Sequence, residues 1–220
     1  MLERITATIF LTILFPFFAL ISVSIYIFSG RPILFKHKRC GYKFDEFYVI
    51  KFRTMRPNKG PSLTGFQDKR ITGIGKILRK LKLDELPQLA NIIKGEMVFI
   101  GPRPESIDIV NNHKNYFTYL DTIKPGITDI NSIIFKDESD LFKTIDTKKY
   151  VDEILPIKYR LALFTSDNQN IFHKIILFLL SILAVIYHKL SLRIVSRFFL
   201  PYDEQKFRIK LNNLLSEQIF

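Results

Sequence analysis

Residues 5–28, ITATIFLTILFPFFALISVSIYIF, carry no charged side chain over 24 consecutive positions. A helix of this length can reach across a hydrocarbon core of about 30 Å, because each residue adds about 1.5 Å. A cleaved signal peptide fits poorly, since Arg4 alone precedes the stretch and no small-residue cleavage site leads into SGRPILFKHKR. The chain is therefore expected to enter a membrane through residues 1–30.

Pro16 interrupts this stretch near its middle. Its ring removes one backbone hydrogen bond and crowds the carbonyl group of Thr12, which disfavours a straight helix. Two arrangements remain open from the residues alone: a kinked span, or a re-entrant hairpin whose arms of about 12 residues are each too short to cross. The basic residues between positions 31 and 39 place the C-terminal flank on the cytoplasmic side in either case.

The overall charge points to an anionic partner. Lysine and arginine exceed aspartate and glutamate by 33 − 21 = 12 residues. Such an excess suits nucleic acid, anionic lipid headgroups or phosphorylated substrates. Cys40 is the single cysteine, so no disulfide can form within the chain, as expected for a reducing, cytoplasmic setting.

The remaining sequence predicts short strands and amphipathic helices rather than one regular repeat. Alternation around Gly41 predicts a β-rich unit, and Pro, Gly, Ser and Asn content predicts a loop after it. Apolar spacing predicts helices later in the chain, with Gly95 ending one of them. The predicted elements are a β-rich unit at 33–55, a loop at 56–68, a basic helix at 74–82, a helix from about 84 to 94, a Pro-Gly turn feeding a strand at 124–135, a helix at 148–164 and a buried or interface-lying helix at 175–187.

Two adjacent carboxylates, Asp84 and Glu85, open the second helix just before Pro87. Proline is tolerated in a first turn, where backbone N–H groups are free and the helix dipole favours anions. One interpretation is that Asp84 is a plain N-cap. The other is phosphate chemistry, because acids can hold Mg²⁺ or attack phosphorus while cations neutralise the transferring group. Cations that could serve are Lys51, Arg53, Arg79 and Arg103.

Four motifs in this chain resemble those of the bacterial sugar transferases, the monotopic polyprenyl-phosphate phosphoglycosyl transferases. They are KFRTM (51–55), DKRITGIGKILRKLKLDELPQLANIIKGEM (68–97), FIGPRPE (99–105) and KPGIT (124–128), in the usual order and at close to the usual spacing. The N-terminal segment and the ILPIKYRLAL helix extend the resemblance to about residue 185.

The resemblance implies transfer of a sugar-1-phosphate from a UDP-sugar to undecaprenyl phosphate, the first membrane step of O-antigen, capsule, exopolysaccharide or glycan assembly. It implies that Asp84 attacks the β-phosphate, releases UMP and carries a covalent phosphosugar, with Mg²⁺ near Asp84. Glu85 would accept a proton or position the metal and acceptor. Further roles are implied for other residues: phosphate binding by Arg79, Arg103, Lys51 and Arg53, and acidic support by Glu105 or Asp108.

The resemblance also favours the re-entrant hairpin, with its break at Pro16, although Phe15 stands where family members carry serine. Lys82 likewise replaces a small serine or threonine. The expected fold is α+β and mainly helical. It comprises a re-entrant helix at 1–30, a cytoplasmic catalytic domain at 31–170 with a small β unit, and amphipathic interface helices at 171–220.

The expected location is the cytoplasmic face of the inner membrane. The expected partners are a UDP-sugar, undecaprenyl phosphate and membrane lipid, with no nucleic acid, and the apolar C-terminal region could serve a homodimer. A membrane-anchored basic binding or scaffold protein without catalysis explains the charge equally well. It does not explain why acids and cations recur in ordered motifs.

Overall fold

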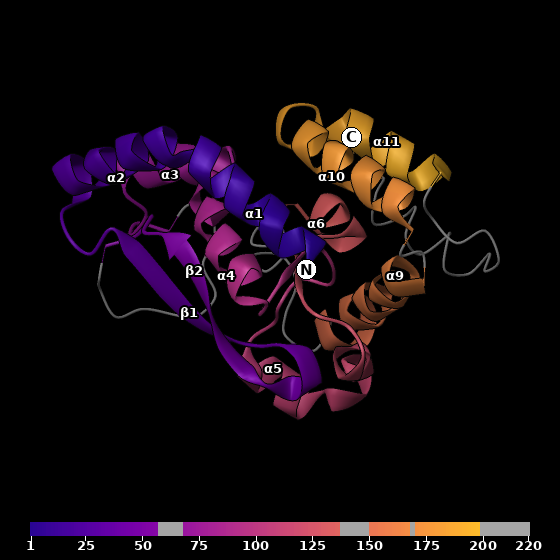
Figure 1. The fold of residues 1–220 in the computed structure, drawn as a ribbon. Helices are drawn as coiled ribbons and strands as arrows, with labels where there is room; N and C mark the ends of the chain where they lie inside the picture. The colour runs from indigo at the N-terminus through magenta and orange to yellow at the C-terminus, as the bar shows by residue number, and fades with distance from the viewer. Residues whose placement is uncertain (57–67, 137–149, 168–169, 199–220) are drawn as a thin grey trace.

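The N-terminal apolar stretch folds into two helices, α1 (Leu2–Ile13) and α2 (Phe15–Ser29), bent by 61° at Leu14 (Figure 1). Pro16 lies in the first turn of α2, where a missing N–H breaks no helical hydrogen bond. The predicted interruption is therefore confirmed. The computed structural model describes residues 1–56, 68–136, 150–167 and 170–198.

Within these ranges, no single helix has both the length and the apolar character to cross a bilayer. The pair α1 and α2 meets the requirement only when the two helices are taken together, as a broken span or a re-entrant loop would. One side of the pair packs on the rest of the protein, through residues such as Ala7, Ile21 and Ile25. The other side leaves large apolar side chains exposed.

The predicted β-rich unit is confirmed as an antiparallel hairpin of β1 (Leu34–Cys40) and β2 (Glu46–Phe52). Its register pairs the first residue of β1 with the last of β2, and a 3₁₀ turn at Tyr42–Phe44 connects the strands. Beyond β2, an isolated bridge joins Met55 to Ile71. Most of the predicted loop at 56–68 lies outside the described residues.

Helix α3 (Gly73–Lys80) confirms the predicted basic helix and is capped by the Thr72 hydroxyl, which accepts from the Gly75 N–H at 3.1 Å. The next helix begins differently from the prediction. A 3₁₀ helix, Leu83–Gln88, comes first, and α4 (Leu89–Lys94) follows before the left-handed Gly95.

Asp84 is not the N-cap of this segment. The capping position is held by Lys82, in the left-handed conformation with φ 55°, and the segment's start has no side-chain cap. The chain leaves α3 and turns directly into the 3₁₀ helix, so both carboxylates fall inside its first turn. Burial of Asp84 and Glu85 follows from this placement.

A second small sheet pairs β3 (Val98–Ile100) with β4 (Gly126–Thr128) in parallel. Between them lie α5 (Ile107–Asn112) and the 3₁₀ turns Lys114–Tyr116 and Thr118–Asp121. The strand predicted within 124–135 is thus only three residues long.

Helix α6 (Ile130–Ile134) follows β4 at once, because the Asp129 carboxylate accepts from the Ser132 N–H at 2.8 Å and caps the helix. This cap is why the predicted strand ends so early.

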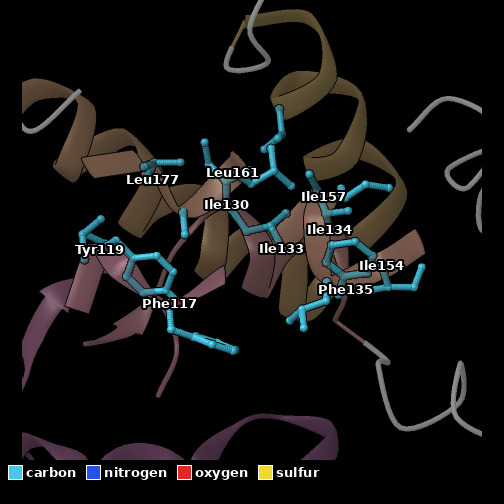
Figure 2. Close-up of a cluster of buried hydrophobic side chains, with 14 of the residues drawn as sticks. Phe117, Tyr119, Ile130, Ile133, Ile134, Phe135, Ile154, Ile157, Leu161 and Leu177 are labelled. Carbon is cyan, nitrogen blue, oxygen red and sulfur yellow. The ribbon is translucent and has the colours of Figure 1, made fainter. Parts of the chain in front are cut away.

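The largest core lies where α6 meets the C-terminal helices (Figure 2). A π-helical turn, Tyr150–Ile154, leads into α9 (Leu155–Asp167), and α10 (Ile171–Ile186) and α11 (His188–Phe198) follow. Helix α10 is half buried, as predicted for 175–187, and α10 and α11 share this core with α6 and α9. Its buried members include Ile130, Ile133, Ile134, Ile154, Leu161, Leu177 and Leu192.

Candidate active site

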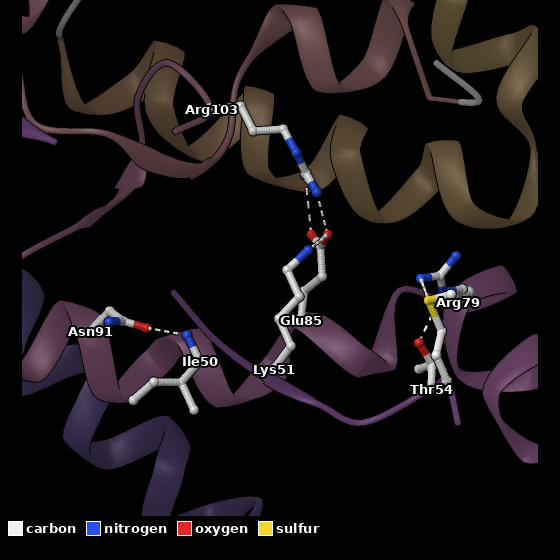
Figure 3. Close-up of polar contacts among 8 residues, drawn as sticks. Ile50, Lys51, Thr54, Arg79, Glu85, Asn91 and Arg103 are labelled. Atoms are coloured by element: carbon white, nitrogen blue, oxygen red, sulfur yellow. Dashed lines mark hydrogen bonds and ion pairs between the residues drawn. The ribbon is translucent and has the colours of Figure 1, made fainter. Parts of the chain in front are cut away.

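Glu85 lies at the centre of a charged cluster assembled from three parts of the fold (Figure 3). Lys51, near the end of β2, donates from Nζ to Glu85 Oε1 at 2.9 Å. Arg103, in the segment after β3, donates from Nη1 to Oε2 at 3.2 Å and from Nη2 to Oε1. The Glu85 side chain is almost fully buried, so this two-cation arrangement holds its carboxylate in one orientation.

Asp84 adjoins this cluster but is held differently. Its side chain is 7% exposed, and its Oδ1 atom is buried without a hydrogen-bond partner in the described residues. A buried polar atom without a partner is uncommon in a folded protein and often marks a functional site.

The two neighbouring acids have opposite electrostatic environments. Burial raises the pKa of Asp84, and the negative charge of Glu85 raises it further. Burial also acts against ionisation of Glu85, but the charges of Arg103 and Lys51 hold its pKa well below the usual range. Glu85 is therefore a fixed anion, whereas Asp84 carries a carboxylate that the described residues do not neutralise directly.

Arg79, from α3, lies against the KFRTM segment. Its Nε donates to Thr54 Oγ1 at 2.9 Å and its Nη2 approaches Met55 Sδ at 3.2 Å (Figure 3). Helix α3 comes this close because Gly75 faces the Thr54 carbonyl oxygen, and a Cβ at this position would overlap that oxygen. The positive charges of Arg79 and Lys51 both act on Asp84.

The hydrogen bonds of Arg53 go to the backbone at the end of α2. Its guanidinium donates to the carbonyl oxygens of Gly30 at 2.7 Å and Arg31 at 2.5 Å, and to that of Ser29. These carbonyls belong to the end of α2 and the turn after it. Arg53 thus caps the end of α2, and its role in phosphate binding stays a prediction.

The predicted acidic support is arranged in another way as well. Glu105 pairs with Lys158 of α9, whose Nζ also donates to Tyr150 Oη at 3.1 Å. Burial disfavours ionisation of Glu105, yet the Lys158 charge and hydrogen bond lower its pKa. Asp108 is exposed in the first turn of α5, and its supporting role stays a prediction.

Asn91 is a positioning residue that the sequence reasoning missed. It is fully buried, its Oδ1 accepts from the Ile50 N–H at 3.1 Å and its Nδ2 donates to the Tyr48 carbonyl at 2.7 Å. These bonds fasten α4 to β2 beside Lys51, which sets the distance to Glu85. An asparagine within the otherwise apolar LANII segment is the signal that could have indicated this.

A metal ion would have few protein ligands here. The described part of the chain has no group of three or more His, Cys, Asp or Glu residues that could hold one. The unpartnered Asp84 Oδ1 nevertheless fits Mg²⁺, which commonly binds one or two carboxylates together with substrate phosphate and water. The donor set therefore suits a magnesium ion completed by a phosphorylated substrate.

Several known proteins are similar in sequence to this chain. The UDP-N-acetylgalactosamine-undecaprenyl-phosphate N-acetylgalactosaminephosphotransferase of Aeromonas hydrophila is 34% identical over 133 residues, which are 58% of this chain and 31% of that protein. The UDP-glucose:undecaprenyl-phosphate glucose-1-phosphate transferase of Xanthomonas campestris pv. campestris is 37% identical over 133 residues, 57% of this chain and 28% of that protein.

The exopolysaccharide production protein ExoY of Rhizobium meliloti (strain 1021) is 33% identical over 144 residues, 57% of this chain and 64% of that protein. The chain thus spans less than two thirds of the length of each of these relatives. The sequence as a whole matches the family described as "Bacterial sugar transferase" over residues 1–188. Because that match covers most of the chain, this protein belongs to the bacterial sugar transferase family.

Proposed function

We propose that this protein transfers a sugar-1-phosphate from a UDP-sugar to undecaprenyl phosphate and releases UMP, with Asp84 as the nucleophile. The observation that carries the proposal is the contrast within the dyad: Glu85 is held by Lys51 and Arg103, while the buried Asp84 Oδ1 has no partner in the described residues. Two relatives are named as transferases that act on undecaprenyl phosphate, which supports the same substrate class here.

The reaction divides into two displacements at one phosphorus atom. In the first, a carboxylate oxygen of Asp84 attacks the β-phosphorus, the bond to the bridging oxygen breaks, and UMP leaves with that electron pair. In the second, an oxygen of undecaprenyl phosphate attacks the same phosphorus. The bond to Asp84 then breaks, and its carboxylate is regenerated.

The surrounding cations suit this chemistry. Arg103 and Lys51 pair with Glu85, and the charges of Lys51 and Arg79 act on Asp84, so these cations would neutralise negative charge on the phosphoryl oxygens. Glu85 keeps Arg103 and Lys51 oriented before substrate arrives, so little reorganisation is needed. A Mg²⁺ ion, when bound through Asp84 and substrate oxygens, would supply further charge neutralisation.

We further propose that the exposed apolar side of the N-terminal helices inserts into the inner membrane from the cytoplasmic face, as a re-entrant pair. The bend at Leu14 and the exposure of large apolar side chains support this placement. A lipid phosphate acceptor could then reach the site from the headgroup layer. The exposed side chains include Ile13, Phe15, Leu20, Val23, Ile27 and Phe28.

The test is UMP release by purified protein supplied with undecaprenyl phosphate, Mg²⁺ and a panel of UDP-sugars. Wild type should release UMP from at least one sugar nucleotide. Without acceptor, its intact mass should rise by one phosphosugar. Asp84→Asn should show neither signal, whereas the matched variant Asp121→Asn, which neutralises an exposed acid, should behave as wild type.

Silence of wild type with every UDP-sugar would favour the alternative, a basic membrane-bound scaffold. Activity retained by Asp84→Asn would remove Asp84 from the mechanism. The topology has its own test, in which Cys40→Ser protein carrying Leu2→Cys is probed with a membrane-impermeant thiol reagent. Labelling from the cytoplasmic side alone is expected, and labelling from outside would mean that the bent pair spans the membrane.

A further inference from the structure

Arg103 reaches Glu85 from a turn whose first half is fixed to β4 (Figure 3). The Gly101 N–H donates to the Thr128 carbonyl at 3.0 Å, and the Gly126 N–H donates to the carbonyl of the residue before Arg103 at 2.9 Å. These bonds continue the parallel pairing of β3 and β4 up to the turn. The start of the turn is therefore placed by the small sheet.

The second half of the turn is held by Glu105. Pro104 has no N–H to donate, whereas the Glu105 carbonyl accepts from the Cys40 N–H at the end of β1, at 3.1 Å. The Glu105 carboxylate pairs with Nζ of Lys158, which also donates to Tyr150 Oη at 3.1 Å. The side chains of Lys158 and Glu105 are only 10% and 17% exposed, so this ion pair lies largely out of water.

The position of the Lys158 ammonium group is set by two helices of the largest core. Lys158 lies near the start of α9, among the buried residues Leu155, Ile157 and Leu161. Its carbonyl accepts from Nδ2 of Asn131 at 3.0 Å, which ties α9 to α6. The cation that meets Glu105 therefore comes from a rigid part of the fold.

Arg103 lies within electrostatic reach of Glu105 as well as Glu85. Arg103, Glu105 and Lys158 line one cavity of about 20 Å³, which has room for about one water molecule and not for a substrate. Burial disfavours ionisation of Glu105, but the charges of Lys158, Arg39 and Arg103 act in the opposite direction and lower its pKa. Two carboxylates thus attract the same guanidinium, and the pairing that the structure shows is with Glu85.

We propose that Lys158 is a positioning residue: by neutralising Glu105, it keeps Arg103 paired with Glu85 and aligned for the donor phosphate. The inference rests on the proposed function, in which Arg103 neutralises charge on the phosphoryl group. Without the Lys158 ammonium group, Glu105 would be a buried carboxylate without its direct partner and would compete for Arg103. An arginine drawn toward Glu105 would leave Glu85 less firmly held and the phosphate less well neutralised.

The first test asks whether removing the charge of Glu105 suppresses the loss of Lys158. UMP release is measured with the best UDP-sugar, undecaprenyl phosphate and Mg²⁺. Lys158→Met should lower kcat about 10- to 100-fold, because a misaligned donor loses part of its transition-state stabilisation. Lys158→Met combined with Glu105→Gln removes the competing charge and should recover kcat to within about fivefold of wild type.

The second test locates the effect at Arg103. In protein that already carries Arg103→Gln, no guanidinium remains to be diverted, so Lys158→Met should change the residual kcat by less than about twofold. The loss of Tm caused by Lys158→Met should persist in both backgrounds, because Tm reports the buried Glu105 and not the alignment of Arg103. A residue whose role is only structural would lower kcat by the same factor with and without Arg103.

A second variant and a matched control complete the design. Lys158→Gln keeps a hydrogen-bond donor beside Glu105 without the charge, and it replaces Lys158→Met if that variant folds poorly. Lys136→Met removes another partly buried lysine, whose Nζ donates to the carbonyls of Ala184 and Val185 at 2.8 and 3.3 Å. Assayed well below its Tm, this control should keep kcat within about twofold of wild type, because it lies apart from the turn.

Failure of Glu105→Gln to restore kcat in the Lys158→Met protein would overturn the proposal. So would an equal loss of kcat from Lys158→Met in the presence and absence of Arg103, or an equal loss from Lys136→Met. All three results require an active wild type, so they differ from the failure of the proposed function, in which wild type releases no UMP at all.

Discussion

Replacing Asp84 by asparagine should stabilise the folded protein while it abolishes turnover. The wild-type carboxylate is 7% exposed, and one of its oxygens is buried without a partner in the described residues. Asparagine has nearly the same shape but no charge, so burying it costs less. Asp84→Asn therefore distinguishes the contribution of Asp84 to stability from its contribution to the reaction.

Asparagine would also leave a buried polar atom without a partner, so the gain comes from removing the charge, which is costly to bury. The positive charges of Lys51, Lys82 and Arg79 offset part of that cost, because they favour ionised Asp84. A gain of about 1–2 kcal/mol in the free energy of unfolding corresponds to a rise of about 2–8 °C in Tm for a chain of this size.

The stability that Asp84→Asn gains over wild type should increase with pH. The folded protein holds the pKa of Asp84 above its ordinary value of 3.8, so the unfolded chain releases this proton first as pH rises. Wild type thus loses stability as pH increases from about 4 through the folded pKa, and the loss is complete above it. The advantage of Asp84→Asn should vanish below about pH 4 and reach its full value near neutrality.

The assay is thermal unfolding of detergent-solubilised wild type, Asp84→Asn and Asp121→Asn, scanned at matched rates from pH 4 to pH 8. Asp121→Asn should follow wild type within about 0.5 kcal/mol, as surface changes usually do. A lower Tm for Asp84→Asn at neutral pH, or a difference that does not change with pH, would refute the electrostatic reasoning.

Three further predictions concern packing and charge. Gly75→Ala should destabilise the protein by about 1–3 kcal/mol, because the added methyl group would overlap the backbone of Thr54. Gly73→Ala, which has open space around it, should be neutral or stabilising. Chemical denaturation compares the stability of the two variants. Lys158→Met should cost about 3–5 kcal/mol by leaving Glu105 buried without its cation, and Glu105→Gln in the same protein should recover part of the loss in a double-mutant cycle. Partial burial and nearby cations lower the pKa of His37 to about 4, so stability should fall as pH drops from 6.5 toward 4. His37→Gln should flatten that part of a curve of Tm against pH, and an unchanged slope would count against a neutral His37 imidazole in the folded protein.

Local patterns predicted the elements of this fold well where periodicity is strong. The alternating residues around Gly41 predicted the β1–β2 hairpin, and Pro16 predicted the break between α1 and α2. The predicted helix start at Asp84 was wrong. In the sequence, a left-handed residue at Lys82 followed by a 3₁₀ turn cannot be distinguished from an ordinary helix cap. The short β4 was also misjudged, since the Asp129 cap ends it early.

The candidate site likewise combines residues that the sequence indicates with contacts that only the structure reveals. Sequence proximity and motif order indicated Asp84, Glu85 and Arg103, and the structure brings these residues into one cluster. Which arginine faces the dyad and which holds backbone elsewhere is decided by tertiary contacts, so Arg53 was not separable from the others. Asn91 was missed for a similar reason, because its bonds to β2 are visible only in the folded structure.

The contact between Arg53 and the end of α2 connects the N-terminal helices to the strand that carries Lys51. Arg53 is two residues from Lys51, and its guanidinium is fixed to three consecutive carbonyl groups at the foot of α2. A displacement of α2 would move Arg53, and with it the end of the strand that carries Lys51. The alignment of Lys51 with Glu85 should therefore respond to the depth at which α2 lies in its surroundings.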